Sequence, residues 1–93
     1  MSFYIYMIIT KRHQKYVSYV GYTNNILKRL ILHNNSKGAK FTRGNKWNLV
    51  LLKKYNNKKD ALKNEYKLKK NYKLRKKLKS NFIKNENSNL ITL

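Results

Sequence analysis

Four side chains in the first half of the chain have types and spacings that suit phosphate chemistry. Tyr6 and Tyr19 lie in two β-favouring runs, and Arg29 and His33 follow in a segment with helix signals. Residues four apart lie on one side of a helix, so Arg29 and His33 could reach the same ligand. A forked guanidinium and an imidazole together suit one phosphate. The apolar residues of this helix could supply its packing without them: Ile26, Leu27, Leu30 and Ile31.

A fifth candidate, Glu65, lies in a second predicted helix. Helical periodicity places it on the same side as Ala61, Leu68 and Tyr72. A carboxylate among apolar residues is costly unless it is paired or binds a metal. The chain has only 3 acidic residues, so this placement of one of them is notable. An ion pair with a nearby lysine or arginine and a divalent-metal site both remain open.

Three β-favouring runs predict the strands that would position the two tyrosines. They span residues 3–9, 16–22 and 47–55, and the first two are expected to form an antiparallel hairpin. The first helix is expected to follow directly, with Thr23 or Asn24 as its N-terminal cap and its end near residue 34.

Two further helices are predicted near the C-terminus. Asn57, with Asp60 three residues later, resembles a capping box that opens a helix reaching about residue 71. A short third helix is expected over residues 73–78, and the Asn-rich residues 80–93 are expected to fray. The order ββαβαα predicts an α/β fold of the α+β type, with a small three-stranded mixed or antiparallel sheet flanked by helices.

Several motifs together resemble the GIY-YIG nuclease superfamily. The stretches Tyr4-Ile5-Tyr6 and Tyr19-Val20-Gly21 resemble its paired signature, although Tyr4 stands where the family name has glycine. Arg29 and His33 stand where the family carries its helix arginine and histidine, and residues 61–70 are similar to the helix that bears its metal-binding glutamate. Residues 38–44, followed by Trp47, resemble the small stand-alone branch and its relatives among structure-selective junction nucleases. The resemblance covers roughly residues 3–78, so we expect one nuclease domain over residues 1–79.

This resemblance implies a divalent-metal-dependent DNA endonuclease, with a role in DNA repair or recombination. Glu65 would hold one Mg²⁺ or Mn²⁺, because such ions prefer oxygen ligands such as its carboxylate. Arg29 and His33 would face the scissile phosphate, and Tyr6 or Tyr19 would take the proton from the attacking water. Gly21 would let the DNA backbone come close.

The charge of the chain agrees with a nucleic-acid partner. The formal net charge is +20, from 23 Lys and Arg residues against 3 acids. Self-repulsion at this charge opposes compaction, and a polyanionic partner is the simplest reason to tolerate it. The basic loop of residues 35–46 is expected to contact DNA phosphates through four cations, which are Lys37, Lys40, Arg43 and Lys46.

The rest of the composition limits the cellular compartment and the kinds of site that the chain can form. The absence of cysteine excludes disulfides and Cys-type zinc sites and fits an intracellular protein, cytoplasmic if bacterial and in an unspecified host compartment if viral. No apolar run approaches the ~20 residues of a membrane helix, and the start lacks the basic region of a signal peptide, so no membrane partner is expected.

Two alternatives remain open: a nucleic-acid-binding module with an inactive site, and a basic DNA-packaging protein. The sequence also leaves open whether the DNA is branched, nicked or plain, and whether the chain works alone, as a dimer or beside a targeting subunit.

Overall fold

The centre of the molecule is a three-stranded antiparallel sheet with the strand order β2-β1-β3. A computed structural model describes the backbone of residues 2–92 and the side chains of residues 2–86. β1 (Phe3–Arg12) and β2 (Lys15–Thr23) form the predicted hairpin, and β3 (Asn48–Tyr55) pairs with the other edge of β1. The hairpin closes through His13 and Gln14, whose φ angles of 50° and 72° give the left-handed turn that fits the twist of paired strands.

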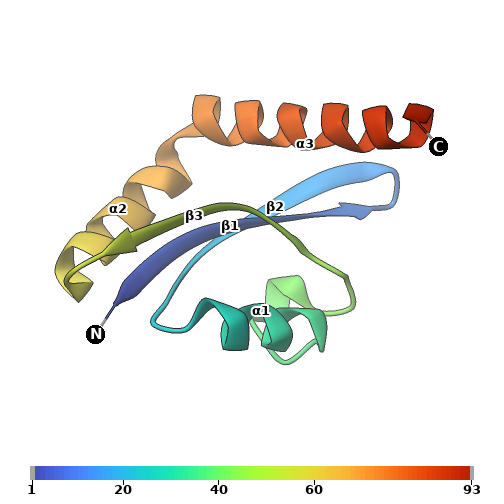
Figure 1. Cartoon of the computed structure of the whole chain (residues 1–93). Helices are drawn as coiled ribbons and strands as arrows, with labels where there is room; N and C mark the ends of the chain where they lie inside the picture. Colours follow the sequence, from blue (N-terminus) through green and yellow to red (C-terminus); the bar gives the residue numbers. More distant parts are fainter. Residues whose placement is uncertain (1, 93) are drawn as a thin grey trace.

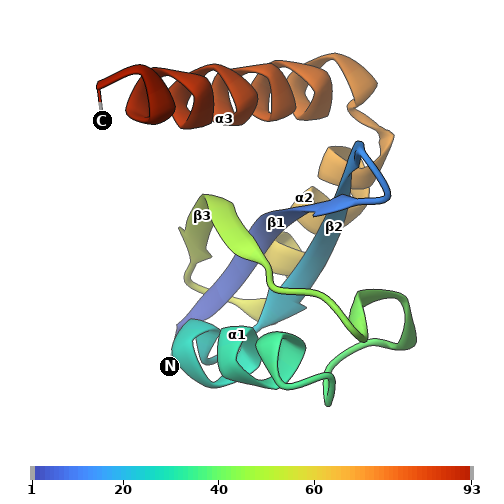
Figure 2. The same ribbon diagram turned by 90° about the vertical axis from the view of Figure 1, so that its right-hand side faces the viewer.

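The helices lie on both faces of this sheet. α1 (Ile26–Asn34) and the short 3-10 helix η1 (Lys40–Thr42) cover one face, and α2 (Lys58–Lys70) and α3 (Tyr72–Thr92) lie on the other (Figures 1 and 2). The α1 cap is Asn25, one residue beyond the expected Thr23 or Asn24, whereas the predicted Asn57 cap of α2 is confirmed. Asn25 caps α1 by accepting from the Lys28 amide at 3.1 Å, and Asn57 caps α2 by accepting from the Asp60 amide at 2.8 Å. The observed order confirms the predicted ββαβαα fold.

Alternate residues of β1 enter two separate cores, as the period of two along a strand requires. On the side of α2 and α3, Ile5 and Met7 pack with Val20, Ala61 and Leu68. On the side of α1, Tyr6 and Ile8 pack with Trp47. β1 is therefore the central element of both cores, and the predicted site residues Tyr6 and Tyr19 belong to the α1 side.

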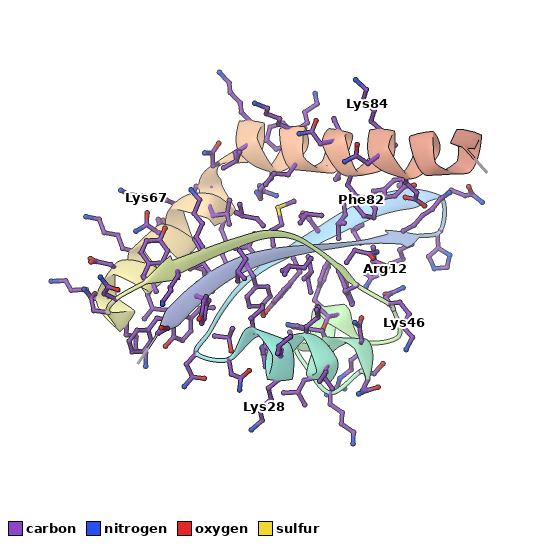
Figure 3. The ribbon with its side chains drawn as sticks, viewed as in Figure 1. Arg12, Lys28, Lys46, Lys67, Phe82 and Lys84 are labelled. Carbon is purple, nitrogen blue, oxygen red and sulfur yellow. The ribbon has the colours of Figure 1, made fainter. Side chains whose placement is uncertain are left out.

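α3 corrects the prediction for the C-terminal segment. The expected helix over residues 73–78 is instead a helix of 21 residues that continues through residue 92. Fraying of residues 80–93 stays a prediction, and Leu93 lies outside the described residues. The cause of the longer helix is a contact with the distant hairpin. The rings of Phe82 and Tyr16 pack in a T-shaped arrangement with centroids 6.2 Å apart, and the Tyr16 hydroxyl donates to Glu86 at 3.1 Å. Phe82 points from α3 toward the hairpin in Figure 3. Within residues 2–92, no helix is both long and apolar enough to cross a bilayer.

Candidate active site

The two site tyrosines lie on neighbouring strands and point to the same face of the sheet. Tyr6 is opposite Gly21 in the strand register, and Ile8 is opposite Tyr19, so the two phenol rings are diagonal neighbours. Their ring centroids are 6.5 Å apart. Tyr6 is 1% exposed, whereas Tyr19 is partly exposed at the edge strand. One tyrosine is thus enclosed and the other is open to a ligand.

The face that α1 turns to the sheet differs from the expected one. Ile26 and Leu30 pack against the tyrosine core as predicted, but Leu27 and Ile31 are 73% and 59% exposed. The inward stripe is completed by two polar residues, Arg29 and His33. The spacing of Ile26, Arg29, Leu30 and His33 is i, i+3, i+4, i+7, which is the pattern of one helix face. The prediction that this helix packs without Arg29 and His33 is wrong.

Arg29, Tyr6, His33 and Thr42 form a continuous chain of hydrogen bonds. The Arg29 Nε donates to the Tyr6 hydroxyl at 3.3 Å. The Tyr6 hydroxyl lies 2.7 Å from His33 Nε2, and His33 Nδ1 lies 2.8 Å from the Thr42 hydroxyl. The Thr42 hydroxyl in turn donates to the Ala39 carbonyl at 2.8 Å. The chain connects β1 to α1 and α1 to η1.

The last of these bonds fixes the direction of all the others. Because the Thr42 proton goes to a carbonyl, its oxygen must accept from His33, so the imidazole proton is on Nδ1. Nε2 is then an acceptor, and the Tyr6 hydroxyl donates to it. Burial, followed by the Arg29 charge, lowers the pKa of His33 to about 4. His33 is therefore neutral near pH 7, as this direction requires.

The same surroundings keep Tyr6 protonated. Burial raises the pKa of Tyr6 above its usual value, and the hydrogen bond from Arg29 offsets only part of this effect. The pKa of Arg29 is raised in turn, first by its hydrogen bond to Tyr6. The resting site thus contains a neutral phenol, a neutral imidazole and one guanidinium charge.

His33 cannot contact a phosphate directly, contrary to the prediction that Arg29 and His33 reach one ligand. Its side chain is 0% exposed and both ring nitrogens are already paired. The sequence reasoning also missed two residues that hold it in place. Thr42 fixes its tautomer, and Gly38 leaves room for the ring, since a Cβ at Gly38 would overlap His33 Nδ1. Both lie in the stretch 38–44, which was singled out only as a resemblance.

Gly21 has a different role from the expected one. It is buried, and a Cβ there would overlap the hydroxyl and ring of Tyr6. The glycine makes space for a side chain of the same protein, which corrects the prediction that it makes space for the DNA backbone.

The basic loop of residues 35–46 is held by contacts that the sequence did not indicate. Arg12 donates to the Phe41 carbonyl at 2.8 Å and to the Asn45 side chain at 2.7 Å. Phe41 stacks on Tyr19 with centroids 6.2 Å apart, so the loop reaches the open tyrosine. The four predicted DNA-contacting cations of this loop, Lys37, Lys40, Arg43 and Lys46, are all exposed. Figure 3 shows Arg12 beside the loop and Lys46 projecting from it.

Glu65 projects from α2, and among the site residues its charge acts on Tyr6. Its carboxylate raises the pKa of Tyr6 slightly. The side chain is 18% exposed and lies 3.6 Å from Lys69 Nζ, four residues later. Among the residues whose side chains are described, no group of three or more His, Asp or Glu residues gathers. The arrangement offers a metal ion one protein carboxylate, and the remaining positions of a hard divalent ion are commonly filled by water and phosphate oxygens.

The tight fit of Tyr6 against Gly21 gives a first prediction. Gly21→Ala should lower the free energy of unfolding by about 1–3 kcal/mol, because the added methyl overpacks the core beneath Tyr6. Urea unfolding measures the change. In a Tyr6→Val background, which removes the ring, the same substitution should cost much less. An equal cost in both backgrounds would show that Tyr6 is not the reason for the glycine.

The buried neutral histidine gives a second prediction, for pH. The pKa of His33 is about 4 in the folded protein, against about 6.5 in the unfolded chain. The unfolded state therefore takes up a proton first as the pH falls below 6.5, so stability is lost between about pH 6.5 and pH 4. The loss should be on the order of 3 kcal/mol. Urea titrations at several pH values should show this slope in wild type and in His13→Asn, which removes the exposed histidine of the turn. His33→Gln should flatten this dependence of stability on pH. A pH dependence in His33→Gln equal to that of wild type would show that His33 is not the titrating group.

The chain is similar in sequence to a known domain family and to several bacterial proteins. Residues 2–79 match the family model of the GIY-YIG catalytic domain. UPF0213 protein CPE1444 of Clostridium perfringens is 41% identical over 87 residues, which cover 90% of each protein. UPF0213 protein OB0043 of Oceanobacillus iheyensis is 46% identical over 52 residues, covering 55% of this chain and 60% of that protein. UPF0213 protein SSP2268 of Staphylococcus saprophyticus is 40% identical over 67 residues, or 71% of this chain and 78% of that protein.

No solved structure shows significant similarity to the chain. The family match spans every residue of the hydrogen-bonded chain, and it also includes Tyr19 and Glu65. By this match and by its similarity to the clostridial relative, the chain belongs to the GIY-YIG family, which is a family of nucleases.

Proposed function

We propose that this protein is a divalent-metal-dependent DNA endonuclease that hydrolyses phosphodiester bonds. The observation that carries the proposal is the convergence of Tyr6, Tyr19 and Arg29 on one face of the sheet, held from behind by the buried His33. A structural hydrogen-bond network has no need of a guanidinium beside an open tyrosine. A site that binds a charged phosphate and moves a proton needs both.

Arg29 would stabilise the negative charge that develops on the scissile phosphate. Its Nε is occupied by Tyr6, while its side chain is only partly buried. The bond to Tyr6 holds the guanidinium in place before the substrate arrives, so little reorganisation is needed when charge develops. Lysine would be a poor replacement, because it lacks the planar fork that can bond Tyr6 and phosphate together.

Tyr19 is the better candidate for the group that takes the proton from water. A general base must come within hydrogen-bond reach of the attacking water, and the Tyr6 hydroxyl is enclosed and already bonded to Arg29 and His33. Tyr19 lies at the edge of the sheet, where solvent and substrate can reach it. Tyr6 and His33 would then orient Arg29 and support the Tyr19 ring, whose centroid is 5.3 Å from that of His33.

Glu65 would hold one Mg²⁺ or Mn²⁺. Its carboxylate is partly exposed, and its long contact to the half-exposed Lys69 is weak enough to exchange for a cation. The bound ion would supply Lewis-acid stabilisation of the phosphate and the leaving oxygen.

DNA is the partner that the charge favours. The loop 35–46 carries four exposed cations, and its Phe41, which lies between Lys40 and Arg43 in the sequence, stacks on Tyr19. Such cations contact phosphates independently of sequence, which agrees with a nuclease that selects DNA by shape, for example a branched or nicked substrate in repair or recombination. The relatives are bacterial proteins, and a bacterial enzyme with this substrate would work in the cytoplasm. A second copy or a targeting subunit could add the selectivity that one small domain lacks.

The central test replaces Glu65. Glu65→Gln should abolish nicking of supercoiled plasmid in Mg²⁺ or Mn²⁺, while DNA affinity stays equal or rises slightly because a negative charge is removed. The fold should persist, since an i, i+4 ion pair on a helix contributes only about 0.3–0.5 kcal/mol. Glu86→Gln is the matched control, because it removes the same charge from α3 and should leave cleavage unchanged.

Three outcomes of this assay separate the candidate functions. Wild-type cleavage that a chelator abolishes, together with an inactive Glu65→Gln variant, supports the nuclease. Tight DNA binding without cleavage of plasmid, branched, nicked or linear substrates would instead favour an inactive binding module or a packaging protein. Cleavage by Glu65→Gln at the wild-type rate would reject Glu65 as the metal ligand.

The two tyrosines should respond differently to the loss of the hydroxyl. Tyr19→Phe should lower the single-turnover rate by about 10²–10⁴-fold with little change in stability, as expected for a general base. Tyr6→Phe leaves His33 Nε2 buried without a donor, so it should cost about 1–3 kcal/mol of stability. The two cleavage rates are compared under conditions where both variants are folded. Cleavage by Tyr19→Phe near the wild-type rate would show that Tyr19 is not the general base.

A further inference from the structure

Arg75 of α3 is a cation that no described acidic residue neutralises. Its Nε is buried and has no hydrogen-bond partner among the described residues. Within residues 2–86, the one ion pair joins Glu65 to Lys69, so no carboxylate is paired with Arg75. A buried hydrogen-bond donor that has no acceptor is unfavourable, especially when the donor belongs to a charged group, so it calls for an explanation. An acceptor supplied by a ligand would remove the penalty.

The side chain lines two adjoining pockets at the edge of the sheet. The larger pocket, of about 290 Å³, is formed by Ser18, Tyr19, Val20, Phe41, Lys69 and Arg75. The smaller pocket shares Ser18 and Arg75 and adds three residues of α3, namely Tyr72, Lys76 and Lys79. Arg75 therefore links the open side of the active site to a row of cations on α3.

The chemistry of this lining suits a phosphodiester. Lys69 and Arg75 supply two positive charges and Ser18 supplies a hydroxyl, with no acid in the lining of either pocket. The stacked rings of Tyr19 and Phe41 form an aromatic wall beside them. A guanidinium can bond two phosphate oxygens at once, and aromatic rings can contact the sugars and bases of the same strand. A strand of nucleic acid uses all of these features, whereas a free phosphate uses only the cations.

We infer that the Arg75 pocket binds a backbone phosphate of the DNA strand, next to the phosphate that lies at Tyr19 and Arg29. This inference rests on the proposed function, because Tyr19 lies both in the active site and in the lining of the pocket. α3 is thus part of the substrate-binding surface, and the strand runs along the edge strand β2 from the loop 35–46 toward α3.

Lys69 connects this pocket to Glu65. Its contact with the Glu65 carboxylate is 3.6 Å long and its side chain is 51% exposed, so a phosphate in the pocket competes readily for the ammonium group. Movement of Lys69 toward the phosphate would leave the Glu65 carboxylate free to bind the metal. The DNA strand itself would then help to prepare the metal ligand.

The test compares Arg75→Gln with Lys84→Gln, which removes the same charge from an exposed position of α3 (Figure 3). Binding of a fluorescent 20-base-pair DNA duplex is measured by anisotropy in the presence of chelator, so that no cleavage occurs. Arg75→Gln should weaken binding about 10-fold or more, as expected for a charge-assisted hydrogen bond. Its salt slope should fall by about 0.9, the value for one phosphate contact. Lys84→Gln should change affinity less than about 2-fold.

Two further measurements separate the pocket from a general effect of charge. Arg75→Lys should keep the salt slope but recover only part of the affinity, because it lacks the fork. The Nε–H signal of Arg75 in a ¹H–¹⁵N spectrum should shift when the duplex is added, since the free donor gains an acceptor. Equal losses for Arg75→Gln and Lys84→Gln, or an unmoved Nε–H signal at saturating DNA, would overturn the inference. Circular dichroism checks that each variant is folded.

Failure of the pocket and failure of the nuclease give different results. If Arg75→Gln binds DNA as tightly as wild type, and wild type still cleaves with metal, then the pocket is rejected and the nuclease stands. If the wild type never cleaves but Arg75→Gln loses affinity as expected, then the pocket stands as a DNA contact and the catalytic role is rejected.

Discussion

The hydrogen bond between the Tyr6 hydroxyl and the His33 imidazole is the contact on which the site depends. It joins the central strand to α1 over 2.7 Å, and both side chains are fully enclosed. Two enclosed polar groups are tolerated only when each is satisfied, so the surrounding residues must meet strict conditions. Gly21 and Gly38 leave the two rings their space, and Thr42 satisfies the far nitrogen of the imidazole. Loss of any one of these contacts would disturb the others.

This contact also determines where α1 and the loop lie. Because His33 must reach Tyr6, α1 turns Ile26, Arg29 and Leu30 to the sheet and leaves Leu27 and Ile31 outside. Arg29 is thereby brought to the Tyr6 hydroxyl, which holds its guanidinium at the margin of the site. Thr42 fixes η1 against the same histidine, and the Trp47 indole donates to the Thr42 carbonyl at 2.8 Å. The packing that buries the histidine is therefore also the packing that orients the arginine.

The few acids of the chain each occupy a position that the structure explains. Asp60 lies in the first turn of α2, where its negative charge interacts favourably with the positive end of the helix dipole. Asn57 also donates a hydrogen bond to its carboxylate. Glu86 accepts from Tyr16 and ties α3 to the hairpin. Of the three acids, only Glu65 influences the pKa of the site residue Tyr6. Little negative charge is left to offset the +20 of the chain, so a polyanion bound along the loop and α3 would relieve the repulsion that the fold tolerates.

The sequence by itself determined the local elements, because these depend on near neighbours along the chain. Alternating residues predicted the hairpin, and the Asn57 cap predicted the start of α2. The motifs around Tyr6, Tyr19 and Arg29 also predicted that these three side chains lie on one face of the sheet, as they do. Tertiary structure decided what each residue does there. A helix of mixed residues has several faces that could pack inward, and the burial of His33 was settled by a partner 27 positions away in the chain.

The same reason explains the other differences. Thr42 and Gly38 matter only because the imidazole lies against them, and nothing in their own neighbourhood indicates this. The segment after residue 80 has weak helical patterning, yet α3 continues because Phe82 contacts a strand that lies far away in the sequence. Short-range propensity and periodicity determine where helices and strands form. Which faces meet, which polar groups become enclosed and which cations stay free are decided by contacts between distant parts of the chain.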